Sequence, residues 1–143
     1  MRRVIIESPF AGDTVRNIAY ARACVRDSLL RNESPLASHL LYTQSGILED
    51  LVPEERSLGI RAGLEWSFHA DAIIFCLDHG WSTGMHEALR YHRGFHKTIE
   101  YRYLYATSQE SAPHDPLRPI ERQTDDSRGL RVLPGSSDQD NPL

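Results

Sequence analysis

Residues 71–94 have the sequence DAIIFCLDHGWSTGMHEALRYHRG, which contains the clearest change from strand to helix in the chain. Residues 71–77 form an almost continuous apolar run, as in a strand that is buried on both faces. A polar turn with two glycines follows, and Ser82 or Thr83 can cap a helix that ends near Gly94. A buried strand that leads through such a turn into a helix predicts an α/β fold.

Three further segments show the same alternation of strand and helix. Residues 3–7 (RVIIE) predict a first strand, 38–43 (SHLLYT) a second and 97–104 (KTIEYRYL) a last one. The element order is then β-α-β-α-β-α-β, which predicts a parallel sheet of about four strands with helices on both faces. We expect a small Rossmann-like three-layer sandwich over residues 1–105.

Two helices are expected before the central strand. Asp13 or Thr14 can cap the first helix, which runs to about Arg31, and Pro53 is a favourable first residue for the second. The helical period places two sets of apolar side chains toward the sheet: Ile18, Ala21, Val25 and Leu29 on the first helix, and Ile60, Leu64 and Phe68 on the second.

Composition limits the class of protein. The chain has 143 residues, of which 40% are hydrophobic and 25% are charged, as in a soluble protein with one core. A formal net charge of −4 argues against a nucleic-acid partner. No apolar run is long enough to span a bilayer or to act as a signal peptide. Cys24 and Cys76 lie in apolar patterns, so we expect buried free thiols and a cytoplasmic location.

The composition changes after Tyr105. Residues 106–143 are rich in Pro, Ser, Asp, Gln and Gly, and their acids outnumber their arginines by seven to four. Such a segment does not bury enough apolar surface to offset the entropy of ordering. We expect a mostly disordered acidic tail, in which residues 129–134 (GLRVLP) are a candidate docking segment.

Three loops of the predicted fold meet at one edge of the sheet. Ligands of parallel sheets bind beyond the carboxyl ends of the strands, where the chain enters the helices. This rule selects SPFAGD after the first strand, the YTQSG loop after the second and DHGWSTGM after the third. The three loops are rich in Gly, Ser, Asp and aromatic residues, so we expect a ligand crevice between them.

The first loop offers groups that suit a flat base and an anion. Phe10 can stack on a base, and Gly12 allows the backbone to approach a ligand closely. The first turn of the next helix, with Arg16, has free N–H groups that suit a phosphate or carboxylate. The alternative is a tight turn with Phe10 in the core and Arg16 in solvent. The candidate substrate-binding residues here are Ser8, Pro9, Phe10, Gly12, Arg16 and Asn17.

The third loop and its helix contain the candidate catalytic residues, Asp78 and Glu87. Asp78 ends the central strand, where it can bind sugar hydroxyls or form the turn. Ser82, Gly84 and Met85 stand at a helix N-terminus, which suits a 5′-phosphate. The Glu87 carboxylate can attack an anomeric carbon or stabilise an oxocarbenium-like transition state. The alternative leaves Ser82 as a cap and Glu87 in solvent.

Other kinds of site have less support. Tyr42, at the end of the predicted second strand, is a further candidate for the crevice. The seven histidines form no H-E-x-x-H motif and no paired C-x-x-C is present, so we expect neither a metal nor a cofactor. The sequence also lacks a P-loop and a G-x-S-x-G elbow.

With these loops placed, the chain resembles the nucleoside 2-deoxyribosyltransferase-like superfamily, small Rossmann-like proteins that include nucleotide N-glycosidases. More closely, over residues 3–104, it resembles short phage and bacterial proteins with the patterns ESPFAGD-x-x-x-N-x-x-YA, SHLLYTQ and D-x-G-x-S-x-GM. This resemblance implies the following roles: Pro9, Phe10 and Gly12 hold base and sugar, Ser82 and Gly84 hold phosphate or sugar, and Glu87 is the nucleophile.

One departure from the superfamily bears on the chemistry. The spacing between the turn glycine and the glutamate differs by one residue, and one residue rotates a helix side chain by about 100°. A carboxylate of Glu87 that faces the crevice, near Asp78 and Phe10, favours an enzyme. Glu87 in solvent with His86 inward favours a binding protein.

The predicted function is therefore binding of a nucleoside or nucleotide, with cleavage or exchange of its N-glycosidic bond. The resemblance also implies a homo-oligomer, and the edge strand at 97–104 is suited to such pairing. The alternative is a catalytically silent nucleotide-sensing or interaction module. A third hypothesis is a scaffold that acts through the tail, which removal of residues 106–143 tests.

Overall fold

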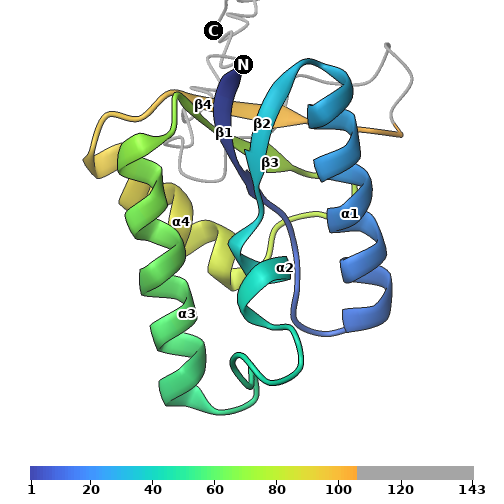
Figure 1. The fold of residues 1–143 in the computed structure, drawn as a ribbon, viewed down its shortest axis with the longest axis vertical. Coiled ribbons are helices and arrows are strands. Elements are labelled where there is room, and N and C mark those ends of the chain that lie inside the picture. The colour runs from blue at the N-terminus through green and yellow to red at the C-terminus, as the bar shows by residue number, and fades with distance from the viewer. Residues whose placement is uncertain (106–143) are drawn as a thin grey trace, which may run out of the picture.

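The computed structural model describes residues 1–105. A four-stranded sheet lies between layers of helices (Figure 1). Its strands have the order β2-β1-β3-β4 and all pair in parallel, which confirms the predicted α/β fold. The strands are β1 (Arg2–Glu7), β2 (Glu33–Leu36), β3 (Ala72–Cys76) and β4 (Ile99–Arg102).

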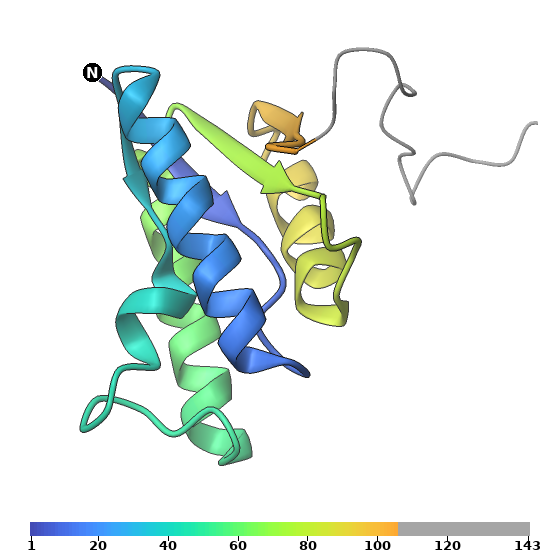
Figure 2. The same ribbon diagram turned by 90° about the vertical axis from the view of Figure 1, so that its right-hand side faces the viewer.

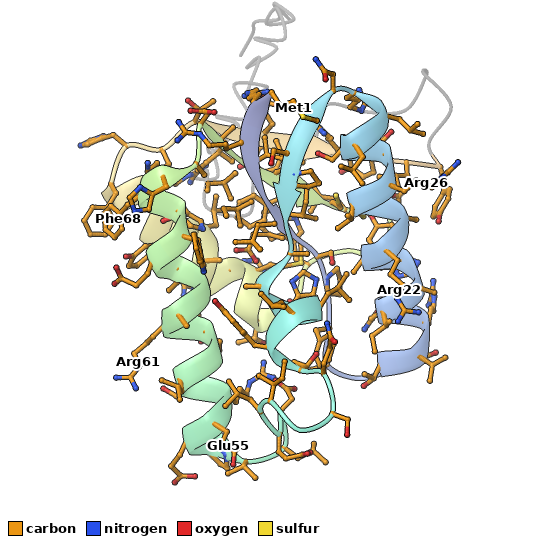
Figure 3. All side chains as sticks on the ribbon, in the orientation of Figure 1. Met1, Arg22, Arg26, Glu55, Arg61 and Phe68 are labelled. Carbon is orange, nitrogen blue, oxygen red and sulfur yellow. The ribbon has the colours of Figure 1, made fainter. Side chains whose placement is uncertain are left out.

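Helices cover both faces of the sheet. Helix α1 lies on one face, and α3 and α4 lie on the other (Figures 1 and 2). Figure 3 shows Arg22 and Arg26 pointing outward from α1, and Arg61 pointing outward from α3. The helices are α1 (Thr14–Leu30), α2 (Ser38–Tyr42), α3 (Pro53–Trp66) and α4 (Thr83–Gly94), with a 3₁₀ turn, η1 (Ser67–His69), after α3.

Two apolar clusters explain why β3 is hydrophobic throughout. Side chains alternate between the faces of a strand, and every residue of β3 is buried. On the α1 face, the fully buried members are Val4, Ile6, Cys24, Ala72, Ile74 and Cys76. On the α4 face, they are Ile73, Phe75, Met85 and Leu89, with Ile5 beside them.

The second strand lies earlier than predicted. Residues 38–43 were expected as a strand, but Ser38–Tyr42 form α2, and β2 occupies Glu33–Leu36. The prediction was wrong because Pro35 makes residues 33–36 unlike a central strand, since proline has no N–H to donate. An edge strand does not need every N–H, so Pro35 fits in β2. Asn32 adopts a φ of 61°, which turns the chain between α1 and β2.

The helices bury only part of the side chains expected: Ala21 is buried, and Val25 and Leu64 pack against the core. On α1, Leu29 is 52% exposed, and the buried residues are Asn17, Tyr20, Ala21, Cys24 and Ser28. On α3, Ile60 is 39% exposed, and Phe68, which lies beyond α3 in η1, is 46% exposed. Periodicity of apolar residues misplaced the buried face of α1 because several buried side chains there are polar and satisfied by hydrogen bonds.

Three further expectations concern membrane spans, the two cysteines and the acidic tail. Among residues 1–105, no helix is long and apolar enough to cross a membrane. Cys24 and Cys76 are buried and unbridged, as expected. The predicted acidic tail, with its segment 129–134, lies outside the described residues.

Candidate functional site

A crevice of about 830 Å³ lies beyond the carboxyl ends of β1 and β3. Its size is in the range of small-molecule sites, and its position follows the rule for parallel sheets. The loop after β1 and the loop after β3, with the start of α4, form two of its walls. Residues from α1, α2 and α3 form the rest, together with Asp50 from the loop before α3.

The first turn of α1 fixes the loop after β1 through hydrogen bonds. The Asn17 side chain donates hydrogen bonds to the carbonyl oxygens of Phe10 (3.1 Å) and Ala11 (3.0 Å). Gly12 has a φ of 92°, a conformation that glycine adopts without strain. Phe10 is half-buried and meets the ring of His39 edge-on at 6.1 Å. The predicted residues Ser8, Pro9, Phe10, Gly12, Arg16 and Asn17 all line the crevice.

The start of α4 faces the crevice. Ser82 caps the helix, because its hydroxyl accepts a hydrogen bond of 3.3 Å from the backbone N–H of Met85. The crevice lining includes Ser82, Gly84, Met85 and, one turn further on, the exposed Glu87. His86 does not line the crevice, and its ring stacks on Trp81 at 5.2 Å. Of the two neighbouring residues, Glu87 is the one that lines the crevice.

Asp78 does not reach the crevice, in contrast to the sequence prediction. Its carboxylate accepts hydrogen bonds from the Tyr20 hydroxyl (2.6 Å) and from the backbone N–H groups of Leu104 and Tyr105 (both 2.8 Å). Burial opposes ionisation, but these hydrogen bonds prevail and lower the pKa of Asp78. Asp78 therefore links α1 to the residues that follow β4, and both of its carboxylate oxygens accept hydrogen bonds there.

Tyr42 also lies elsewhere. Its hydroxyl accepts a hydrogen bond of 2.9 Å from the indole N–H of Trp66, beside a pocket of about 60 Å³ between α2 and α3. The YTQSG loop does not line the crevice. Because β2 ends at Leu36, the residues that follow it at the rim are Ser38 and His39.

Glu7 and His39 join Ser8 in the lining of the crevice, which was not predicted from the sequence. The Ser8 hydroxyl lies 2.9 Å from Nε2 of His39, whose pKa is lowered by burial and partly restored by the nearby Glu7 carboxylate. Oε1 of Glu7 lies 3.6 Å from Nε2 of His92. The strand alternation from Ile5 predicts the side on which Glu7 lies, and that signal was available in the sequence.

Two arginines bring positive charge to the crevice. Arg56 donates to both oxygens of Asp50, at 2.7 and 2.6 Å, so its charge is balanced within the wall. Arg16 is exposed in the first turn of α1. Together with the N-terminus of α4, Arg16 suits an anionic group such as a phosphate.

Most of the chain matches a known family of domains. Residues 2–102 match the family model DUF7768, described as a domain of unknown function. The chain belongs to the DUF7768 family. No curated protein matches this DUF7768 domain in sequence.

A solved structure shares the fold of this DUF7768 domain. It is a 2-deoxyribosyltransferase from the psychrotolerant bacterium Bacillus psychrosaccharolyticus, described as a biocatalyst for nucleoside synthesis. The two chains align with a TM-score of 0.53 and 18% sequence identity, over 77% of each chain. This likeness shows that residues of this chain adopt a nucleoside deoxyribosyltransferase-like fold.

Proposed function

We propose that this DUF7768 domain binds a nucleoside or a nucleoside 5′-monophosphate and cleaves or exchanges its N-glycosidic bond. Glu87 carries the proposal, because its exposed carboxylate lines the crevice in the first turns of α4. The fold shared with a 2-deoxyribosyltransferase adds support. The crevice volume of about 830 Å³ is large enough for a nucleotide.

Each part of the ligand has a counterpart in the crevice wall. Phe10 and Trp81 offer aromatic surfaces for the base. The backbone N–H groups at Ser82 to Gly84, and Arg16 in the same lining, suit a phosphate at the 5′ end. Between these ends lies the sugar, whose anomeric carbon is the target of the Glu87 carboxylate.

The reaction proceeds in two displacement steps. A carboxylate oxygen of Glu87 forms a bond to the anomeric carbon while the bond from that carbon to the base nitrogen breaks. The electron pair stays on the base, which takes up a proton. Water, or a second base in an exchange, then attacks the anomeric carbon, loses a proton and releases the Glu87 carboxylate.

Base release from a panel of nucleosides and 5′-monophosphates, measured by chromatography, tests this function. The variant Glu87→Gln keeps the size of the side chain and removes the nucleophile, so release should fall by at least about 10³-fold. Glu65→Gln is the matched control, since Glu65 is exposed on α3 and does not line the crevice. Its activity should equal that of the wild type.

Other outcomes separate the alternatives. Release that survives in Glu87→Gln would leave an N-glycosidase whose nucleophile is another residue. No release by the wild type, together with a rise in melting temperature on adding a nucleotide, would favour the catalytically silent sensing module.

The proposal includes a homo-oligomer in a reducing, cytoplasmic environment. Strand β4 is an edge of the sheet in the described residues, and edge strands can pair with a copy of themselves. The free thiols of Cys24 and Cys76 are compatible with such a compartment. Light scattering on the purified protein measures the number of subunits.

A further inference from the structure

His92 is an unusual residue in the core. Its side chain is 1% exposed, and neither ring nitrogen has a hydrogen-bond partner within residues 1–105. Leaving a buried polar group unpaired lowers the stability of the fold, so such a group in a native protein requires an explanation. The acidic group near it is Glu7, whose Oε1 lies 3.6 Å from Nε2 of His92.

Glu7 connects this histidine with the crevice. As the last residue of β1, it lies on the same face of the strand as Ile5, which packs on the α4 side. Its side chain is 18% exposed and lines the crevice. The pair therefore has a buried member, His92, and a member that a ligand can touch, Glu7.

Other carboxylates of the crevice have structural partners. Among residues 1–105, four carboxylate side chains line it: Glu7, Asp13, Asp50 and Glu87. Asp13 caps α1 through the backbone N–H of Arg16, and Asp50 holds Arg56. Glu7 and Glu87, which come from β1 and α4, are the two that remain for a substrate.

We infer that Glu7 is the general acid and base of the glycosyl transfer, and that His92 is a positioning residue that holds and stores its proton. This inference rests on the proposed function. Glycosidic bond cleavage generally uses two carboxyl groups, one as nucleophile and one for proton transfer. The 3.6 Å separation of Glu7 and His92 is acceptable, since catalytic hydrogen bonds are often long before substrate binds.

The protons balance over the two steps. In the first, Glu7 gives a proton to the leaving base nitrogen as the glycosidic bond breaks and Glu87 bonds to the anomeric carbon. His92 supplies that proton to Glu7 and becomes neutral. In the second, Glu7 accepts the proton of the attacking water, the bond to Glu87 breaks, and the proton returns to His92.

A substrate that needs no proton tests the role of Glu7. The base of 7-methylguanosine is already cationic and leaves without protonation, whereas guanosine requires an acid. In Glu7→Gln, kcat on guanosine or the preferred natural nucleoside should fall by about 10²-fold or more with little change in KM, and kcat on the 7-methyl substrate by less than about tenfold. Equal losses on both substrates, or no loss, would overturn the inference.

The pH profile tests His92. An imidazolium is a weaker acid than a carboxylic acid, so a proton shared with a histidine is retained to higher pH. With His92→Gln, the decline of kcat at high pH should therefore move at least about one unit toward acid. An unchanged profile would leave His92 with a packing role only. The titratable groups that share the crevice lining with Glu7 include His39 on α2, Asp50 in the loop before α3, Arg56 on α3, and Glu87 and Tyr91 on α4.

Controls separate this inference from the function it rests on. His69→Gln changes an exposed histidine outside the crevice and should keep the wild-type profile. If a variant at position 92 does not fold, the comparison of the two substrates in Glu7→Gln still tests whether Glu7 is the general acid. Wild-type inactivity on every nucleoside overturns function and inference together, whereas activity that is unaffected by Glu7→Gln overturns the inference alone.

Discussion

Arg102 on β4 donates two hydrogen bonds, each of 2.7 Å, to Glu33 on β2, at the opposite edge of the sheet. These strands are separated by β1 and β3, so the contact depends on the twist that sheets acquire (Figure 1). Glu33 is only 6% exposed, and Ser28 on α1 also donates to it. The Arg102 guanidinium lowers the pKa of Glu33 to about 2, although burial opposes ionisation.

Loss of this carboxylate should destabilise the fold. Glu33→Gln leaves the charge of Arg102 without its partner, so the free energy of unfolding at pH 7 should fall by about 2–4 kcal/mol. The pKa of Glu33 is lower in the folded state, so its contribution is complete above about pH 4.5 and is lost as the pH falls toward about 2. Urea denaturation at pH 7 and pH 3 measures both effects, and the two proteins should differ less at pH 3.

An exposed ion pair is the control for this prediction. Arg3 likewise lowers the pKa of Asp71 to about 2, but both side chains are largely in solvent. Water and salt screen such pairs, so Asp71→Asn should cost much less stability than Glu33→Gln. Equal losses for the two variants would contradict the importance of the buried contact between the edge strands.

Asp78 should act on stability and not on catalysis. Its hydrogen bonds to Tyr20, Leu104 and Tyr105 keep it out of the crevice. We expect Asp78→Asn to lose about 1–3 kcal/mol of stability and to change kcat by less than about threefold. Tyr20→Phe should lower the melting temperature in the same direction. A loss of kcat as large as that of Glu87→Gln would show that Asp78 takes part in the reaction.

Local signals explain what the sequence could predict. The apolar run of Ala72–Cys76 is long enough to identify a central strand, and Asp13 and Ser82 were found as helix caps because capping depends on near neighbours. By contrast, β2 has four residues and contains Pro35, so no local pattern identifies it. Its pairing with β1 decides its conformation.

In the site, too, features set by local sequence were predictable and those set by distant contacts were not. Loops after parallel strands predicted most of the crevice, including Glu87, from the order of elements alone. The position of Asp78 depends on Tyr20, which lies 58 residues away, and no sequence pattern gives that contact. His92 follows Met85, Ala88 and Leu89 at helical spacing, so its burial was predictable, but its approach to Glu7 was not.

A glycine on α3 should set the distance between α3 and α2. A Cβ added at Gly63 would lie 2.8 Å from Cβ of Ser38, too close for two carbon atoms. Gly63→Ala should therefore separate the two helices and lower the free energy of unfolding by about 1–3 kcal/mol. Because both residues line the crevice, KM for the substrate should also rise. Chemical denaturation and steady-state kinetics measure these effects.

Two further variants check that steric cause. Ser38→Gly removes the atoms in conflict, so it should restore most of the stability lost in Gly63→Ala. In Gly59→Ala, on the same helix, the new Cβ meets the flexible end of Leu48 at 3.2 Å and Cβ of Tyr42 at an ordinary 3.8 Å. Alanine also favours helix over glycine by about 1 kcal/mol. Gly59→Ala should be neutral or stabilising. A loss at position 59 as large as that at 63 would point to backbone effects instead of the Ser38 contact.

Trp81 should report ligand binding by its fluorescence. It lines the crevice, stacks on His86 at 5.2 Å and packs beside Phe75 at 5.3 Å. Because the chain has two tryptophans, the variant Trp66→Phe leaves Trp81 as the single emitter. Titration with nucleoside 5′-monophosphates should change its emission in a saturable way, because a bound base alters the polarity around the indole. Inorganic phosphate should compete if the 5′-phosphate binds at the start of α4. A change of equal size in Trp81→Phe, where only Trp66 emits, would place the ligand outside the crevice.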